Sequence, residues 1–310
     1  MIFFAIPFFN KAEYLHETLI SLIRQTCPHW NAAVFDDASE PQQSQLAANH
    51  VKRLGDARIQ YKKNATNLGM AKNWNQGLLA GINHPTAIAT TILHADDRLL
   101  EDYVLAMSNA LRGNPQITAV FCKTVIIDNK GQRSFSFADF YKKTLISTNS
   151  DKEVILNGVD GIAKLIPGNF IFCPTLCYRN FELLERFDEQ FKMVLDLEFI
   201  LRLLKKGNQL LGLYAQPLFE YRRHAANATN VLTQNLQRFY EEEALYSELA
   251  NWLLGHGYIT LSKEAAKMTV IKKNLIFLFF QAIVTGRLKL AYKYINHLLR
   301  MNELHNEFLK

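Results

Sequence analysis

The five residues Leu93-His94-Ala95-Asp96-Asp97 indicate both the fold class and the place of a functional site. They close an apolar, β-branched run that begins at Ala87 and predicts a buried strand, so two adjacent carboxylates stand where this strand ends. In open α/β sheets the ligand crevice lies at the carboxyl ends of the strands. Carboxylate oxygens at such a place suit a hard cation that also binds substrate phosphates. Taken alone, the pair fits a solvated turn as well, because Asp is common at strand ends.

The pattern around this segment alternates between strand and helix from Met1 to about residue 125. Strands are predicted at residues 2–6, 32–35, 59–61, 87–93 and 117–127, and helices at about residues 13–25, 42–54, 70–80 and 101–112. Such alternation is typical of an α/β fold in which helices cover both faces of a mostly parallel sheet.

The later part of the chain changes character twice. Residues 128–165 are irregular and indicate an excursion or a mobile loop, whereas residues 196–206 predict a helix. Beyond His224 helical periodicity dominates and no further strand is evident. We therefore expect one domain at residues 1–225, followed by a helical C-terminal extension at residues 226–310.

The composition is that of a globular protein, with 49% hydrophobic and 21% charged residues. A net charge of +6 permits an anionic partner, but it is too small and too dispersed to indicate nucleic acid binding. The four cysteines follow no CxxC or zinc pattern, so we expect reduced thiols in a cytoplasmic protein. The first apolar stretch lacks a basic region before it and is broken by Pro7 and Asn10, which favours a strand over a signal peptide. No stretch approaches the roughly 20 apolar residues that span a bilayer.

Several short segments accompany the carboxylate pair. They are Ile6-Pro7-Phe8-Phe9-Asn10 with Leu19, Ser21, Leu22 and Gln25; Phe35-Asp36-Asp37-Ala38-Ser39; Asn67-Leu68-Gly69 with Asn75-Gln76-Gly77-Leu78; Asp196-Leu197-Glu198-Phe199 with Arg202; and Tyr221-Arg222-Arg223-His224. In this order and at these spacings, the segments resemble the family-2 glycosyltransferases, which have the GT-A fold. The resemblance covers roughly residues 1–225. It implies a nucleotide-sugar half at about residues 1–127 and an acceptor half at about residues 128–225.

The implied reaction is the inverting, metal-dependent transfer of a sugar from a nucleotide-diphosphate sugar, with a UDP-sugar favoured. The implied acceptor is a hydroxyl of a glycan or of a lipid-linked glycan, which points to the synthesis of cell-surface polysaccharide. Two other functions stay open. A nucleotidyltransferase would normally carry a Gly-rich, Lys- or Arg-bearing loop after the first strand, which Pro7-Phe8-Phe9-Asn10 is not. The second alternative is a catalytically silent sugar- or nucleotide-binding module. His94 leaves this alternative open, because the family usually has an acid at that position.

The resemblance also implies which residues bind the donor. The first turn and Asp37 would hold the base and the ribose, since a carboxylate accepts hydrogen bonds from a ring N–H and from sugar hydroxyls. The other expected donor contacts are Pro7, Phe9, Asn10, Asn67, Asn75, Asp96 and Arg223. Phe9 stands where the family commonly has Tyr. Local roles stay open for some of these residues: Asp37 as a cap, Asn67 as a turn residue and Arg223 as part of a solvated basic turn.

The expected metal ligands are Asp96, Asp97 and His224, with Mn²⁺ or Mg²⁺ as the cation. Departure of a nucleoside diphosphate develops negative charge on phosphate oxygens, which a divalent cation stabilises. The resemblance identifies Asp196 as the general base, because an acceptor hydroxyl needs a positioned carboxylate to take its proton. An N-cap role for Asp196 is compatible with that assignment.

The C-terminal extension has a basic and apolar segment at residues 272–300. Its cations are Lys272, Lys273, Arg287, Lys289, Lys293 and Arg300, and it has no Asp or Glu. A basic amphipathic helix pair of this kind either lies on an anionic membrane surface, or packs its apolar stripe on the catalytic domain or in a homodimer. The first alternative predicts a cytoplasmic protein that is peripheral at the inner face of the membrane.

Overall fold

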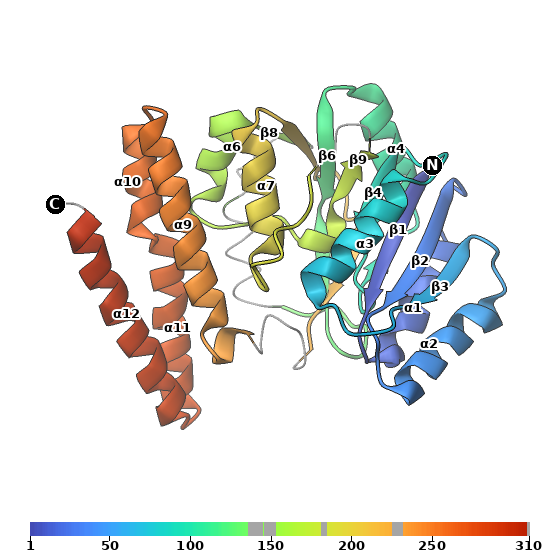
Figure 1. Cartoon of the computed structure of the whole chain (residues 1–310), viewed down its shortest axis with the longest axis horizontal. Helices are drawn as coiled ribbons and strands as arrows, with labels where there is room; N and C mark the ends of the chain where they lie inside the picture. Colours follow the sequence, from blue (N-terminus) through green and yellow to red (C-terminus); the bar gives the residue numbers. More distant parts are fainter. Residues whose placement is uncertain (136–144, 146–152, 181–184, 225–231, 309–310) are drawn as a thin grey trace. The chain divides into compact units, whose positions relative to one another are not determined.

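The computed structural model describes residues 1–135, 145, 153–180, 185–224 and 232–308, with side chains to residue 302. The chain divides into two compact units, and Figure 1 labels many of their helices and strands. The first unit comprises Met1–Ile162, Phe170–Gln190 and Leu195–His224. The second comprises Ala163–Asn169, Phe191–Val194 and Ala225–Lys310.

The first unit begins with the predicted alternation of strands and helices. Its elements are β1 (Ile2–Phe8), α1 (Ala12–Ile23), β2 (Trp30–Asp36), α2 (Pro41–Leu54), β3 (Ile59–Lys63), α3 (Met70–Ile82) and β4 (Ala89–Ile92). Strand β1 pairs in parallel with β2 and β4, and β2 pairs in parallel with β3. The expected α/β architecture is confirmed in this part of the chain.

The remainder of the unit extends this sheet and adds a smaller one. It consists of β5 (Arg98–Leu99), α4 (Tyr103–Gly113), β6 (Ile117–Cys122), β7 (Thr124–Ile127), β8 (Glu153–Asn157), α6 (Gly158–Leu165), the 3₁₀ turn η1 (Cys173–Thr175), β9 (Cys177–Arg179), α7 (Leu195–Lys205), β10 (Gln209–Leu213) and β11 (Phe219–Arg222). The strand order is β3-β2-β1-β4-β9-β6-β10-β8 in the large sheet and β5-β11-β7 in the small one. Strands β9 and β8 run antiparallel to their neighbours.

Two sequence predictions in this region need correction. The single strand expected at residues 117–127 is two strands, because the chain changes partner at Lys123. The N–H of Lys123 donates to the carbonyl of Leu213, the last residue of β10, whereas the carbonyl of Lys123 accepts from the N–H of Leu218, directly before β11. The prediction of an irregular excursion at residues 128–165 is wrong for residues 153–165, because these residues form β8 and α6. Residues 136–144 and 146–152 of that excursion lie outside the described residues.

The core of the first unit follows from the apolar periodicity of its elements. Strand β1 is central and buried on both faces, with Ile2, Phe4 and Ile6 fully buried. Helix α1 presents Leu15, Leu19 and Leu22 to the same cluster at a spacing of four and three residues. This packing fixes the sheet whose carboxyl edge carries the candidate site.

Helix α3 lies against β1 so closely that only glycine fits at position 77. A Cβ atom on Gly77 would lie 2.5 Å from the Cβ of Ala5, in the middle of the sheet. Gly77→Ala is therefore expected to lower the free energy of unfolding by roughly 1–3 kcal/mol through overpacking. The matched control is Gly113→Ala, because a Cβ there meets no atom within 4 Å and alanine favours a helix. Thermal and urea denaturation should separate the two variants, and an equal loss of stability in both would contradict this account.

The second unit is helical, as expected for the C-terminal extension. Its long helices are α9 (Gln237–Gly255), α10 (Ile259–Lys267), α11 (Thr269–Val284) and α12 (Leu288–Phe308). Two short segments from earlier in the chain belong to it: the carboxylate of Glu241 accepts from the N–H of Met193 at 2.7 Å, and the hydroxyl of Tyr246 donates to the carbonyl of Ile166 at 3.1 Å. None of the helices in the described part of the chain is both long enough and apolar enough to cross a bilayer.

Candidate functional site

The carboxylates of Asp96 and Asp97 lie in the tight turn between β4 and β5, and they have different surroundings. Asp97 is fully buried, whereas the side chain of Asp96 is 26% exposed. The N–H of Asp97 donates to the carbonyl of His94 at 3.3 Å, which closes the turn. Of the two carboxylates, that of Asp96 is therefore the one that reaches solvent.

Asp97 is fixed by hydrogen bonds to residues of β11 and α1. Its Oδ1 accepts the backbone N–H of Arg222 at 2.7 Å, and its carbonyl accepts the hydroxyl of Thr18 at 2.7 Å. Its Oδ2 has no hydrogen-bond partner among the residues that the structure describes, and lies 3.7 Å from Nδ1 of His94. Burial raises the pKa of Asp97 well above its usual value, and the negative charge of Asp96 adds to this.

Asp96 contacts His224, which lies two residues after the end of β11. The Nε2 atom of His224 lies 2.8 Å from Oδ2 of Asp96, across 128 residues of sequence. Burial alone would raise the pKa of Asp96, but the hydrogen bond to His224 and the charges of His94 and His224 hold it below its usual value. The ring of Tyr14 packs on that of His224 at 5.2 Å. The ends of β4 and β11 thus bring together two of the three predicted metal ligands.

The donor atoms around Asp96 fit a divalent cation. One side-chain donor from each of His94, Asp96 and Asp97 lies within 4.8 Å of the others, and His224 contacts Asp96 directly. Two of these groups have a buried atom without a hydrogen-bond partner in the described part of the chain, namely Nε2 of His94 and Oδ2 of Asp97. A mixed set of carboxylates and imidazoles is suited to Mn²⁺, with Mg²⁺ preferring oxygen alone.

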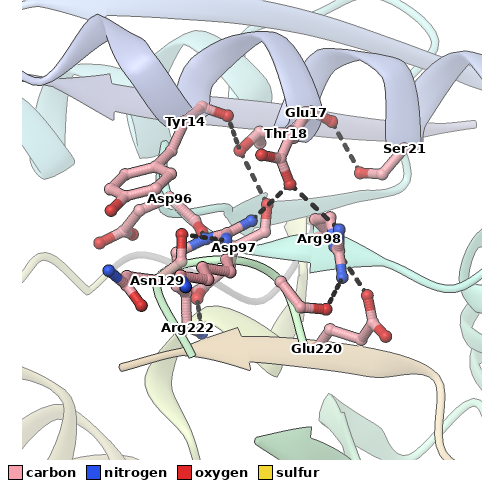
Figure 2. A network of polar contacts seen from close by, with 12 residues as sticks. Tyr14, Glu17, Thr18, Ser21, Asp96, Asp97, Arg98, Asn129, Glu220 and Arg222 are labelled. Atoms are coloured by element: carbon pink, nitrogen blue, oxygen red, sulfur yellow. Dashed lines mark hydrogen bonds and ion pairs between the residues drawn. The ribbon is translucent and has the colours of Figure 1, made fainter. Parts of the chain in front are cut away.

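Behind the carboxylate turn lies a buried arginine that the sequence analysis did not single out. The guanidinium of Arg222 is fully buried, donates to Glu17 at 2.6 Å and to the carbonyl of Asp96 at 2.8 Å, and stacks on Tyr14 at 4.6 Å (Figure 2). Glu17 also accepts from Arg98 at 3.0 Å, so one carboxylate of α1 joins the turn to both strands β5 and β11. No periodicity marks Arg222 in advance, because β11 is short and its two buried residues are three positions apart.

We expect Arg222→Met to destabilise the first unit by about 3 kcal/mol, since it removes a buried charge from its partners. Arg98→Met is the matched control, because Arg98 binds the same Glu17 but has a side chain that is 25% exposed. The loss of unfolding free energy in Arg98→Met should stay near the ~1 kcal/mol that is typical of exposed ion pairs. Urea denaturation of both variants measures the difference, and a larger loss for Arg98→Met would contradict the role of burial.

The predicted nucleotide residues of β1 and β2 lie at the same edge of the sheet as Asp96, because β2, β1 and β4 are consecutive parallel strands. The N–H of Asp37 donates to the carbonyl of Phe8 at 2.8 Å, and the N–H of Asn10 donates to the hydroxyl of Ser39 at 2.8 Å. Pro7 is the partly exposed residue of β1, and Phe9, just beyond the strand, is 53% exposed. The first turn therefore presents an aromatic face at the carboxyl edge.

Asp37 itself is buried and orders the loop before α3. Its Oδ1 accepts the N–H of Leu68 at 2.8 Å and its Oδ2 that of Gly69 at 2.9 Å, while the amide of Asn67 donates to its carbonyl at 2.9 Å. Asp37 and Asn67 are thus brought together. Asp37 contacts the backbone of this loop and the side-chain amides of Asn64 and Asn67, and a contact of Asp37 or Asn67 with the nucleotide stays a prediction.

Asn75 and Asp196 are linked through the segment that precedes α7. Both amide atoms of Asn75 bind the backbone of Phe187, at 2.9 and 2.8 Å, so Asn75 fixes that segment to α3. Asp196 is partly exposed in the first turn of α7. Burial raises the pKa of the Cys173 thiol, and the charges of Asp196 and Asp97 raise it further.

Arg223 is the remaining predicted residue. Its N–H donates to the carbonyl of Ile127 at 2.8 Å, and its guanidinium lies 5.6 Å from the ring centre of Tyr221. These contacts place Arg223 beside β7, directly before His224 in the chain. A diphosphate contact of Arg223 stays a prediction.

The chain is similar to a known protein family and to several solved structures. The model of the family described as "Glycosyl transferase family 2" matches residues 3–187. No curated protein matches the chain at a significant level. Among solved structures, residues 1–349 of S. aureus TarS superpose with a TM-score of 0.56 at 15% identity, covering 98% of this chain and 91% of that one.

Two further structures carry ligands. The complex of S. aureus TarS 1–349 with UDP-GlcNAc has a TM-score of 0.56 at 15% identity and covers 86% of this chain and 79% of that one. GalNAc-T7 with UDP, GalNAc and Mn²⁺ has a TM-score of 0.51 at 12% identity and covers 72% and 44% of the two chains. At these identities the likeness shows a shared fold.

Proposed function

The chain belongs to glycosyl transferase family 2, and from that premise we propose that it transfers a sugar, with inversion, from a nucleotide-diphosphate sugar to a hydroxyl of a glycan or lipid-linked glycan. Its fold is of the GT-A type, with a helical C-terminal extension. The observation that carries the proposal is the contact of Asp96 with His224 at the carboxyl edge of the sheet, at 2.8 Å. This pair has the composition and the exposure that a metal-bound diphosphate requires.

Within the proposed site, Asp96 and His224 would hold a divalent cation, with Asp97 and His94 behind them. When bound, the cation stabilises the negative charge that develops on the departing nucleoside diphosphate. Arg222 fixes the backbone of the carboxylate turn, so that the Asp96 side chain does not need to reorganise during the reaction. Arg223, next to His224, supplies a further positive charge for the diphosphate.

The nucleotide would lie along the ends of β1 and β2. Phe9 offers an apolar face for the base, with Pro7 and Asn10 shaping the turn. Asp37, Asn67 and Asn75 hold the loop and the helix that border this space, and we propose that they also contact the nucleotide. Uridine is the favoured base, because structural neighbours crystallised with UDP and UDP-GlcNAc share this fold.

The acceptor side would be served by Asp196. Its carboxylate takes the proton of the acceptor hydroxyl as the new C–O bond forms, and attack from the face opposite the diphosphate inverts the anomeric centre. In this proposal residues 1–225 form the catalytic domain and residues 226–310 the extension. A lipid-linked acceptor would place the enzyme in the cytoplasm at the inner face of a membrane, in the synthesis of cell-envelope polysaccharide.

A screen of nucleotide sugars by thermal stabilisation, with and without Mn²⁺, tests the donor. Binding at a hundredfold excess over Kd should stabilise the fold by roughly 2.7 kcal/mol. Release of the free nucleoside diphosphate on addition of candidate acceptors then tests transfer. Absence of any stabilisation across the panel of nucleotide sugars would contradict the proposal.

A catalytically silent binding module is the second candidate, and His94 is the observation that favours it. His94 stands where family members usually have an acid, and its ring packs against that of Trp74 in a tilted arrangement with ring centres 5.3 Å apart. Metal-dependent binding of a uridine nucleotide without turnover, with every acceptor offered, would support this alternative. His94→Asp would then be expected to restore transfer.

A further inference from the structure

The second unit carries a surface, outside the proposed catalytic site, that combines apolar and basic side chains. It lies at the connection between α11 and α12, which Figure 1 shows as neighbouring helices. Gly286 has a φ of +70° and ends α11, and the N–H of Arg287 donates to the carbonyl of Ala282 at 2.8 Å. The chain thus reverses within three residues, and the end of α11 lies next to the start of α12.

Large apolar side chains gather around this reversal. The hairpin tip, as we call it, consists of Phe280, Ile283, Val284, Leu288 and Tyr292, which are 60%, 44%, 86%, 65% and 67% exposed. On α11 these residues are spaced by three and four positions, and on α12 by four, so each helix presents one face. The tip therefore forms a patch rather than scattered single residues.

Packing within the unit accounts for only one side of α11. Of the ten residues Leu275–Val284, Gln281 alone is polar, so the helix is apolar on nearly every side. Only Ile271, Leu275 and Ala282 of α11 are buried. A helix that is apolar all round belongs in a protein core or in contact with lipid. On α11 the apolar side chains of Phe280, Ile283 and Val284 stay exposed.

The charges around the tip indicate the nature of that partner. Residues 265–302 contain seven basic residues and no Asp or Glu. Arg287, Lys289 and Lys293 are exposed within this stretch, beside the apolar patch. In a symmetric dimer through the tip the same patch would face itself, and these cations would oppose one another. A surface of fixed negative charge complements them instead.

We propose that the hairpin tip docks onto the surface of a lipid bilayer that contains anionic lipid. The five apolar side chains enter the boundary between head groups and acyl chains, and the cations bind the lipid phosphates. Helix α11 has 16 residues and a length of about 24 Å, which is shorter than the ~30 Å hydrocarbon core, so the hairpin lies in the interface.

Vesicle sedimentation with the purified full chain tests this proposal. The chain should sediment with vesicles of mixed phosphatidylcholine and phosphatidylglycerol, but not with phosphatidylcholine alone, and less so at high salt. Val284→Asp together with Leu288→Asp should lower the partition coefficient at least about tenfold. Lys289→Gln and Lys293→Gln should each lower it about fivefold. Leu254→Asp on α9 is the control and should have no effect, since Leu254 is also exposed, at 50%, but lies outside the tip.

The contrary outcomes are distinct. Equal weakening by Leu254→Asp, or binding that ignores the lipid charge, would overturn the proposal. So would a chain that does not sediment with anionic vesicles but forms a concentration-dependent dimer, which Val284→Asp with Leu288→Asp converts to monomer. Thermal stabilisation by nucleotide sugars should be unchanged in all tip variants, so failure of membrane docking and failure of the proposed catalytic function are separable.

Discussion

Replacing Asp196 by Asn is expected to lower kcat by about 10²–10⁴-fold, the usual effect of losing a positioned base. Asn keeps the size and the hydrogen-bonding reach of Asp but cannot take the proton of the acceptor hydroxyl. Asp196 is the second residue of α7 and not its N-cap, so Asn removes only a favourable charge near the helix N-terminus and the start of α7 should be preserved. Donor affinity should also stay unchanged, because Asp196 lies in α7, whereas the predicted donor residues lie at or just after the ends of β1, β2, β4 and β11 or belong to α3 and the loop before it.

Glu198→Gln provides the matched control for this experiment. Glu198 is in the same first turn of α7, but its carboxylate pairs with Arg202 at 2.7 Å. Its substitution should cost some stability and leave kcat close to normal. Transfer rates with saturating donor and acceptor, together with donor Kd values from titration, measure both variants. Near-normal transfer by Asp196→Asn would exclude Asp196 as the base.

The second large effect is expected at Asp96. Asp96→Asn removes the charge of the exposed carboxylate that contacts His224, so both metal-dependent donor binding and turnover should fall, turnover by about 10²–10³-fold. A chelator should have the same effect on the unaltered protein, and Mn²⁺ should reverse it. The physical reason is that the diphosphate and Asp96 would repel each other without a cation between them.

Asp56→Asn is a suitable control for Asp96. Asp56 precedes β3 and so lies at the amino end of that strand, away from the carboxyl edge, where it pairs with Arg58 at 2.6 Å. Its substitution should leave donor binding unchanged. Turnover that continues undiminished in the presence of chelator would refute the metal assignment, whatever the behaviour of Asp96→Asn.

The parts of the fold that could be predicted from the sequence are those in which local periodicity decides the structure. The buried strand before Asp96 and the stripe of Leu15, Leu19 and Leu22 on α1 are examples, because burial and helix geometry act over a few residues. Helix α12, which has an apolar and a polar side, was predictable on the same ground, whereas α11 is apolar on nearly every side. The family resemblance supplied the roles of the site residues, which no periodicity contains.

The parts that could not be predicted depend on distant contacts. The change of strand partner at Lys123 has no signal in the sequence, because the residues on both sides of it, within 117–127, have the apolar pattern of a strand. Strand β8 was missed because it is an edge strand with a single buried residue, Leu156, and hence a weak apolar signal. Arg222 was missed for a related reason. Its hydrogen bonds are to Glu17 and to the carbonyl of Asp96, which are distant in the sequence and come close only in the folded chain.

The bond between Glu17 and Arg222 joins residues that are 205 positions apart in the sequence. During synthesis at about 5–20 residues per second, roughly 10–40 s separate the emergence of the two partners. Closure of so long a loop also costs entropy before any contact forms. A growing chain therefore has most of its large sheet before its carboxylate turn can be fixed. Binding competence should arise abruptly and late, once β11 has emerged, and released fragments that end before Arg222 should be inert toward the donor.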